Sequence, residues 1–150
     1  MSVHNLNVFF EPKIVALIAS KKESNQAIRL IRHLIKHEYA GAVLPIIEGA
    51  DTCAGIHSYS DLNALPSVPD LAMLLLPPED WLEAIQDLVR VGCKRVVLLH
   101  DILPVPQLTP QLTKCLLEAA SVNGLRILGP IQLGLASMIF KFNALQTDLP

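Results

Sequence analysis

The sequence is poor in the residues on which disulfide-rich and zinc-dependent proteins rely. It has three cysteines, Cys53, Cys93 and Cys115, and none lies in a Cys-x-x-Cys pair. An odd number at wide spacings argues against a disulfide framework and against a zinc site, and the histidines show no metal-ligand spacing. We therefore expect free, buried thiols, no bound metal and a cytoplasmic, reducing location.

Strong charge and long apolar runs are also missing. The formal net charge is −2, so the chain lacks the basic footprint of a nucleic-acid-binding protein. No stretch approaches the roughly 20 apolar residues that cross a bilayer. The N-terminus has no basic segment followed by an apolar one, which is the pattern of a signal peptide. We expect neither a nucleic-acid partner nor a membrane.

What the chain does have is a large apolar fraction. Hydrophobic residues make up 51% of its 150 residues, charged residues only 17%, and the mean hydropathy is +0.42. This length suits one domain, and strands of a parallel sheet covered on both faces are unbroken apolar runs of this kind. The composition therefore favours a heavily buried α/β domain.

Apolar runs alternate with amphipathic segments along the chain. Strands are expected at residues 14–19, 42–47, 71–76, 95–99 and 126–128, and helices at about 25–38, from Pro78 to just before Gly92, and at about 110–123. A short extended piece is expected at 56–59, and a helical turn at 61–65. In the last helix, Leu112, Leu116, Leu117 and Ala120 are expected to face inward. This order predicts an α/β fold: a three-layer Rossmann-like domain with a parallel sheet of about five strands. We place the domain at 1–136, and a C-terminal tail or the start of a linker at 137–150.

Prolines and glycines add local detail. Pro45 lies inside the second apolar run and favours an edge strand or a strand end, because it cannot donate to a neighbouring strand. Gly41, Gly92 and Gly124 follow the helical segments, where left-handed residues are expected. Gly129-Pro130 is expected to turn the chain after the last strand.

The turn after the first apolar run is the most informative part of the chain for function. In parallel α/β sheets ligands bind beyond the carboxyl ends of the strands, and phosphates lie over a helix N-terminus. Residues 20–26 form such a turn, with Ser24 or Asn25 as a plausible N-cap, but contain no glycine. Lys21 and Lys22 fit either phosphate contacts or solvated surface charges, and Glu48 adds a negative charge nearby.

One pair of residues invites a catalytic interpretation. His100 and Asp101 follow the fourth predicted strand at the same edge. Adjacent residues at a strand end point apart, and no nucleophile is evident, so a structural or incidental role is favoured. We predict no catalytic residue in this chain.

Several motifs resemble the CoA-binding N-terminal domain of NDP-forming acyl-CoA synthetases, which is related to the succinyl-CoA synthetase α subunit. The motifs are Pro12-Lys13-Ile14-Val15-Ala16-Leu17-Ile18-Ala19-Ser20, Tyr39-Ala40-Gly41-Ala42-Val43-Leu44-Pro45-Ile46, Gly55 with Ser58-Tyr59-Ser60-Asp61-Leu62, Pro69-Asp70-Leu71-Ala72, Gly92-Cys93-Lys94 and Gly124-Leu125-Arg126-Ile127-Leu128-Gly129-Pro130. Each is weak alone, but they follow the family in order and spacing over more than a hundred residues. The likeness is greatest to the module of bacterial protein lysine acetyltransferases.

The resemblance implies that the domain binds CoA or acetyl-CoA. The residues that it nominates are Ala19, Ser20, Lys21, Lys22, Asn25, Ala27, Ile47, Glu48, Leu76, Pro77 and Pro78. It also implies a parent chain that is an acyltransferase or an ADP-forming acyl-CoA synthetase. In such a chain the partners of this domain are a CoA ester and the following domains, or further copies in a homo-oligomer.

The chain departs from the family in its ligand-facing loops. The family has glycine where this chain has Ile18 and Ala27, Asn-Pro or Thr-Pro where it has Ile47-Glu48, and Asn where it has Ile131. Two alternatives follow. The domain is a degenerate module for packing, oligomerisation or allosteric sensing, or it binds an NAD-type nucleotide, for which Glu48 supplies the acid but the glycines are missing.

Overall fold

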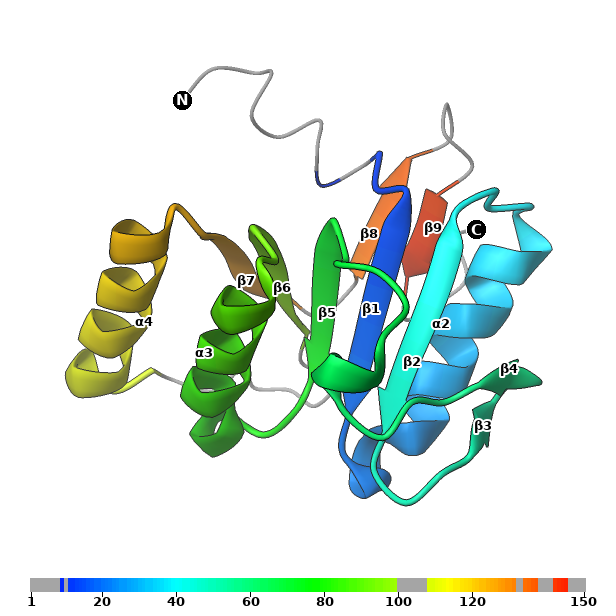
Figure 1. The fold of residues 1–150 in the computed structure, drawn as a ribbon, viewed down its shortest axis with the longest axis horizontal. Coiled ribbons are helices and arrows are strands. Elements are labelled where there is room, and N and C mark those ends of the chain that lie inside the picture. The colour runs from blue at the N-terminus through cyan, green and yellow to red at the C-terminus, as the bar shows by residue number, and fades with distance from the viewer. Residues whose placement is uncertain (1–8, 10, 100–107, 132–133, 138–141, 146–150) are drawn as a thin grey trace.

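The apolar runs of the sequence form the strands of one parallel sheet (Figure 1). The computed structural model describes residues 9, 11–99, 108–131, 134–137 and 142–145. The strands are β1 (Ile14–Ala19), β2 (Ala42–Ile47), β5 (Leu71–Leu75), β6 (Arg95–Leu99) and β7 (Arg126–Ile131), in the spatial order β2-β1-β5-β6-β7. The chain therefore reverses its direction of winding between β1 and β5, where ligands of such sheets bind.

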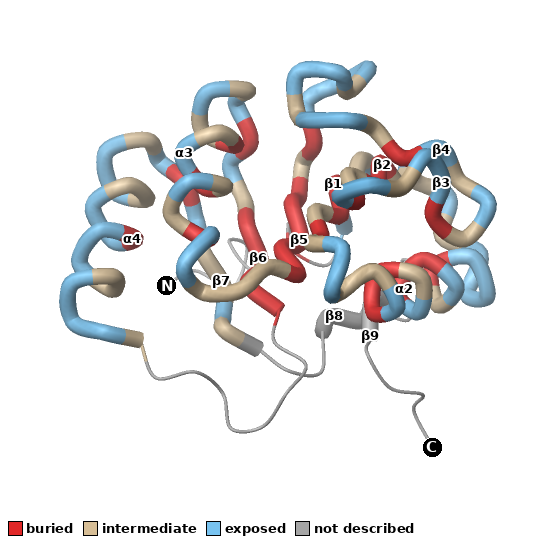
Figure 2. Tube along the Cα trace, turned by 90° about the horizontal axis from the view of Figure 1, so that it is seen from below, coloured by how far each residue is buried: buried red, intermediate tan, exposed pale blue. Residues whose placement is uncertain are grey.

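Helices cover both faces of this sheet. Helix α2 (Ser24–Lys36) lies on one face, and α3 (Trp81–Val91) and α4 (Pro110–Asn123) lie on the other (Figures 1 and 2). Successive β1 residues alternate between two cores: Val15 packs in the core on the α2 side, and Ala16 in the core that contains Trp81 of α3. The predicted three-layer Rossmann-like fold with five parallel strands is confirmed.

The element boundaries follow the predictions within a few residues, with one difference at the start of α2. A 3₁₀ turn over Lys21–Glu23 precedes the helix, so the N-cap is Glu23, and no side-chain bond caps it. The predicted N-caps Ser24 and Asn25 lie inside the first turn instead. Two further 3₁₀ turns, Leu62–Ala64 and Pro78–Asp80, correspond to the predicted helical turn at 61–65 and to the predicted start of the helix at Pro78.

The end of α2 corrects the interpretation of Gly41. Glu38 has the positive φ of 56°, and its N–H and that of Tyr39 donate to the carbonyls of Ile35 and Leu34 at 3.0 Å each. These bonds form the Schellman pattern, so the left-handed residue comes three positions before the glycine. Gly41 is needed for space: a Cβ there would lie 2.6 Å from the Lys13 carbonyl oxygen. Gly92 and Gly124 are left-handed, as predicted.

Strand β2 lies at the edge of the sheet, as Pro45 predicted. Its outer side is bonded by the loop that follows: the Tyr59 N–H donates to the Pro45 carbonyl at 2.8 Å, and the Ile47 N–H donates to the Ser58 hydroxyl at 3.0 Å. The short antiparallel strands β3 (Thr52–Cys53) and β4 (Ile56–His57) position this loop. The loop thereby covers an edge that would otherwise expose unpaired backbone groups.

Three predictions in the C-terminal third are wrong. Gly129-Pro130 does not end β7, because the strand continues to Ile131 after a register shift opposite Val97–Leu99. Cys115 is exposed, although Cys53 and Cys93 are buried. Leu117, expected to face inward, is 64% exposed. Helix α4 fully buries only Leu116, but Leu112 and Ala120 also pack against the core, so its expected inner face is correct except at Leu117.

A two-stranded hairpin follows the sheet. Strand β8 (Gly134–Ser137) pairs antiparallel with β9 (Phe142–Leu145), and β9 contacts α2. Figures 1 and 2 show the hairpin on the α2 side of the sheet. It extends across residues 136 and 137, where the sequence placed the end of the domain; the division into 1–136 and 137–150 stays a prediction.

Candidate functional site

The carboxyl ends of β1, β2 and β5 meet at one edge of the sheet and bring together several predicted ligand residues. Ala19 pairs in register with Ile47 of β2 on one side and with Leu75 of β5 on the other. Beyond the strands, the Ser20 N–H donates to the Leu75 carbonyl at 3.3 Å, and the Glu48 N–H to the Ala19 carbonyl at 3.2 Å. The three loops therefore start side by side at the topological switch point.

The turn after β1 does not need the missing glycine for its backbone conformation. Ser20 is extended, with φ −71° and ψ 162°, and its carbonyl accepts from the Glu23 N–H at 3.0 Å. Among the described residues, the only non-glycine residues with positive φ are Glu38 and Ala54. The absence of glycine at this turn therefore bears on how closely a ligand can approach, and leaves the fold of the turn intact.

Glu48 makes the contact that defines this edge. Its Oε2 accepts a hydrogen bond from the Lys21 backbone N–H at 3.3 Å. The Lys21 N–H belongs to the turn that leads into α2, where an anion is favoured by the helix dipole. A carboxylate of the protein thus lies where the N-terminal end of this helical segment attracts negative charge. Glu48 itself is exposed.

The remaining predicted residues differ in what they offer a ligand. Lys21, Lys22 and Asn25 are exposed on the turn and the start of α2. Ala27 is fully buried in the core between α2 and the sheet, so its side chain does not reach the ligand edge. The site assignments as a set stay a prediction.

On β5, the residues after the strand are held by the following helix. The Leu76 carbonyl accepts from the Trp81 indole N–H at 2.9 Å. Pro77 is extended and caps the 3₁₀ turn in which Pro78 is the first residue. Both prolines are half-buried, and they form a rigid wall beside the turn after β1.

A hollow of about 730 Å³ opens beside Glu48, at the carboxyl end of β2. Its size is in the range of small-molecule sites. Its lining residues are Ile47, Glu48, Gly49, Ala50, Asp51, His57, Ser58, Tyr59, Ser60 and Ala64. The rings of His57 and Tyr59 meet edge to face, with centroids 4.8 Å apart. Asp51, His57 and Tyr59 were not among the predicted site residues, and the one available signal in the sequence was the Ser58-Tyr59-Ser60 motif.

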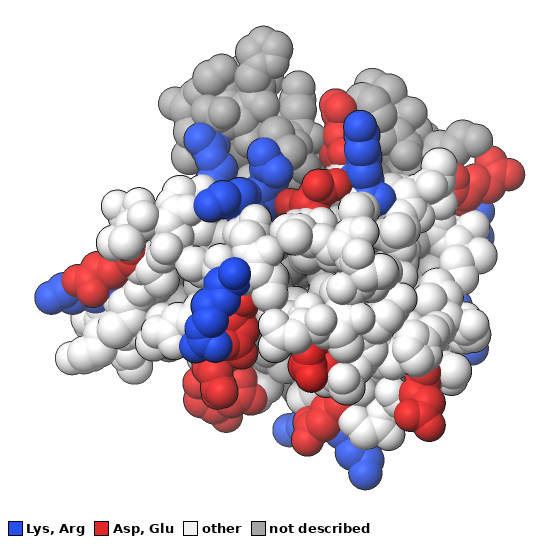
Figure 3. All heavy atoms as spheres, in the orientation of Figure 1, with Lys and Arg blue, Asp and Glu red and all other residues white. Residues whose placement is uncertain are grey.

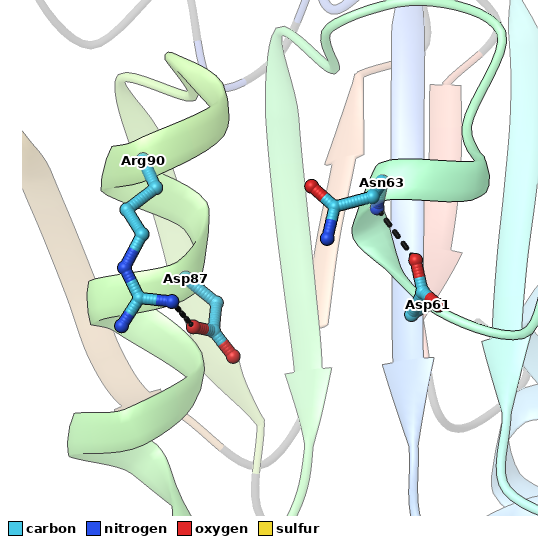
Figure 4. A network of polar contacts seen from close by, with 4 residues as sticks. All are labelled: Asp61, Asn63, Asp87 and Arg90. Atoms are coloured by element: carbon cyan, nitrogen blue, oxygen red, sulfur yellow. Dashed lines mark hydrogen bonds and ion pairs between the residues drawn. The ribbon is translucent and has the colours of Figure 1, made fainter.

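Ile18, where the resembled family has glycine, lies at a second groove on the opposite face of the sheet. This groove, of about 440 Å³, has Ile18 and Ile46 among its lining residues. Its rim is polar (Figure 4): the Asp61 carboxylate accepts from the Asn63 N–H at 2.8 Å, and Arg90 pairs with Asp87 on α3 at 2.7 Å. Ile18 therefore faces the α3 side, away from the turn itself.

The charge of the ligand edge is predominantly acidic. The loops after β1, β2 and β5 contain Glu23, Glu48, Asp51, Glu79 and Asp80, against Lys21 and Lys22. Figure 3 shows acidic groups outnumbering basic ones along the lower edge, whereas basic groups gather at the upper edge, near the amino ends of β6 and β7. The edge at which ligands of this fold bind thus repels a polyanion except at its two lysines.

Among the described residues, no three His, Cys, Asp or Glu side chains group as a metal site, and no helix is long and apolar enough to cross a membrane. His100 and Asp101 lie outside the described residues.

A five-stranded parallel sheet of this order, with a turn leading into a helix at its switch point, is an architecture common among nucleotide-binding α/β domains. A family model described as "CoA binding domain" matches residues 13–136. The chain belongs to this CoA-binding domain family and resembles the N-terminal part of ADP-forming acyl-CoA synthetases.

Two relatives from the comparison with curated proteins make the resemblance concrete. The α subunit of acetate–CoA ligase [ADP-forming] I from Pyrococcus furiosus is 26% identical over 146 residues, which covers 93% of this chain and 32% of the relative. A trans-feruloyl-CoA synthase from an unknown prokaryotic organism is 28% identical over 98 residues, covering 65% of this chain and 14% of the relative.

Solved structures of other proteins share the fold of this chain. Dinucleotide-forming acetyl-coenzyme A synthetase 1 from Ca. Korarchaeum cryptofilum, in complex with phosphate and ADP, superposes with a TM-score of 0.82 at 26% identity, over 95% of this chain and 31% of that one. A hypothetical protein from Pyrococcus horikoshii OT3 shares the fold, with a TM-score of 0.63 at 20% identity, over 85% of this chain and 83% of that one. The chain thus spans about a third or less of the acyl-CoA-synthesising relatives.

Proposed function

We propose that this chain binds CoA or an acyl-CoA at the carboxyl ends of β1, β2 and β5. The diphosphate lies over the turn at Ser20 and the start of α2, next to Lys21 and Lys22. The rest of the ligand follows the edge between Glu48 and Pro77-Pro78. The observation that carries the proposal is the convergence of these three loops at the switch point of a CoA-binding family fold.

The two lysines supply the only basic side chains of these loops. Their ammonium groups pair with phosphate. The Lys21 and Glu23 N–H groups are already bonded to Glu48 and to the Ser20 carbonyl, so the lysine side chains make the main contribution. The surrounding carboxylates weaken this attraction. The expected affinity is therefore micromolar, and it falls as the salt concentration rises.

The domain functions as one module of a longer protein. Its acyl-CoA-synthesising relatives are about three times as long or longer, which supports a parent chain that is an ADP-forming acyl-CoA synthetase or a protein lysine acetyltransferase. In that context this module holds the CoA ester and packs against the following domains. The chemical step belongs to those domains.

A second function, a non-binding module for packing, oligomerisation or allosteric sensing, is favoured by other observations. The ligand edge is acidic, and Leu117 and Val122 on α4 are 64% and 82% exposed. The third candidate function is binding of an NAD-type ligand, and its support is the acidic residue Glu48 after the second strand.

Calorimetry on the full chain with CoA, acetyl-CoA and NAD separates the three. We expect micromolar binding of CoA and acetyl-CoA, and a loss of about tenfold when Lys21 and Lys22 are both changed to alanine. Lys114→Ala, a matched loss of one exposed lysine on α4, leaves the affinity unchanged. Absence of binding to all three ligands would favour the packing module, and binding of NAD alone would favour the third candidate.

A further inference from the structure

Glu48 occupies an unusual place for a protein that binds a polyanion. It follows the edge strand β2, and two hydrogen bonds fix it there: its N–H donates to the Ala19 carbonyl, and its carboxylate accepts from the Lys21 N–H. The carboxylate is therefore held in the gap between the ends of β1 and β2. The backbone donor lies at the N-terminal end of a helical segment, where a negative charge is favoured.

An acid at this position recognises a particular part of a nucleotide. In dinucleotide-binding α/β folds, an acidic residue near the end of the second strand accepts hydrogen bonds from ribose hydroxyls, and a cationic side chain there accommodates a ribose phosphate. An ionised carboxylate accepts through several lone pairs, so the bond from Lys21 does not use up its capacity. Glu48 is thus equipped to bind a ribose that carries free hydroxyls.

The hollow beside Glu48 extends the same chemistry. Its lining includes a second carboxylate, Asp51, and residues 47–60 contain no lysine or arginine. A ribose phosphate placed there meets two negative charges and no permanent cation. The rings of His57 and Tyr59 in the same hollow offer an apolar surface to a base.

We propose that Glu48 makes this site selective for adenine nucleotides whose ribose hydroxyls are free, so that the chain binds dephospho-CoA in preference to CoA. The inference rests on the proposed function, because it takes the diphosphate to lie at Lys21 and Lys22 in both ligands. The two ligands differ only in the 3′-phosphate. A difference in affinity therefore reports the surroundings of the ribose alone.

The test is calorimetry on the full chain with dephospho-CoA and with CoA, at pH 8, well above the ordinary histidine pKa of about 6.5. For the wild-type chain we expect a Kd for dephospho-CoA about tenfold below that for CoA, as for one like-charge contact near a surface. Glu48→Gln keeps the size and the acceptor but removes the charge. This substitution is expected to lower the ratio of the two Kd values, CoA over dephospho-CoA, to about twofold, chiefly by tightening the binding of CoA.

Glu118→Gln is the matched control, because it removes one exposed carboxylate on α4 and changes the net charge equally. The Glu118→Gln variant is expected to keep the tenfold ratio between the Kd values for CoA and dephospho-CoA. Equal affinity of the wild-type chain for the two ligands would overturn the inference while leaving the proposed function intact, as would a Glu48→Gln variant that shifts both affinities alike. Failure of every variant to bind either ligand would overturn the proposed function, and this inference with it.

Discussion

The two ends of the parallel sheet each contain a carboxylate, and the two are used differently. At the amino end, Asp70 precedes β5, and its Oδ2 accepts from the N–H groups of Lys13 and Ile14 at 2.9 and 3.0 Å. Its own N–H donates to the Ile14 carbonyl at 2.9 Å. At the carboxyl end, Glu48 accepts one side-chain bond of 3.3 Å from Lys21. Asp70 joins two strands, whereas Glu48 lies on an exposed loop.

The neighbours of Asp70 close the amino end further. The Tyr39 hydroxyl donates to the Pro12 carbonyl, and the Ala42 N–H donates to the Lys13 carbonyl at 2.9 Å. Backbone groups at this end are thus bonded within the protein, whereas the carboxyl end combines a hollow, two exposed lysines and an exposed carboxylate. The amino end of the sheet is thus a structural end, and the carboxyl end is the candidate binding end.

The largest effect on stability is expected for Asp70→Ala. It leaves two backbone N–H groups at the start of β1 without their acceptor and lowers the free energy of unfolding by about 3 kcal/mol. Asp61→Ala is the control, since Asp61 also accepts from two backbone N–H groups but on an exposed 3₁₀ turn, and it costs about 1 kcal/mol. Urea unfolding followed by circular dichroism measures both. Equal losses would contradict the structural role given to the amino end.

Gly41→Ala is expected to have the next largest effect. The added methyl would lie 2.6 Å from the Lys13 carbonyl oxygen and against the Tyr39 ring, so the start of β1 must shift, at a cost of about 2 kcal/mol. Gly49→Ala, at the carboxyl end, meets nothing within 4 Å and pays about 1 kcal/mol for its φ of 74°. Chemical unfolding measures the free energy of unfolding of both variants. A smaller loss for Gly41→Ala than for Gly49→Ala would show that the start of β1 shifts at little cost.

Tyr39 makes the amino end sensitive to high pH. Burial, and then the charge of Asp70, raise the pKa of the Tyr39 phenol to about 12, from an ordinary value of 10.0. The folded state therefore holds this proton more tightly than the unfolded state, and the stabilisation present below pH 10 is lost as the pH rises towards 12. We expect urea midpoints to fall over this range, and to fall less in Tyr39→Phe. The sequence has two tyrosines, so the variant leaves Tyr59 as the only tyrosinate absorbance. Parallel midpoint curves for the two proteins would contradict the assignment.

The smallest change in stability is expected at the binding end. Glu48→Gln removes the charge of an exposed side chain with one long hydrogen bond, so the free energy of unfolding changes by no more than about 0.5 kcal/mol. The same substitution changes nucleotide selectivity, which gives the opposite pattern to Asp70→Ala. A loss of stability comparable to that of Asp70→Ala would mean that Glu48 has a structural role, and that the two ends of the sheet do not differ in the way described.

Much of the fold follows from local patterns in the chain. The unbroken apolar run at 71–76 predicts a strand buried on both faces, and every residue of β5 is buried. Pro45 pointed to an edge strand or a strand end because a proline has no N–H to donate to a neighbouring strand, and β2 is an edge strand. Helix α4 was predicted less well, since Leu116 and Leu117 are equally apolar and only packing decides that one is buried and the other exposed.

The candidate site shows the same division. Its position followed from strand order, because carboxyl ends of parallel strands share an edge. Its detailed surroundings did not: Ala27 appeared to be a ligand residue and lies in the core, and only the Ser58-Tyr59-Ser60 motif hinted at the hollow that His57 and Tyr59 line. These facts depend on the pairing of the loop with the outer side of β2, which joins Pro45 to Tyr59 across the chain.

The parallel α/β architecture follows from the amino-acid pattern alone, because strand and helix periodicity and right-handed crossovers allow few other arrangements. The family also follows from it, through motifs spread over most of the chain. The bonds of Glu48 to the Lys21 N–H and of Asp70 to the start of β1 become visible only in the folded chain, because each contact joins residues far apart in sequence. A carboxylate acquires its role from the backbone donors that folding brings to it.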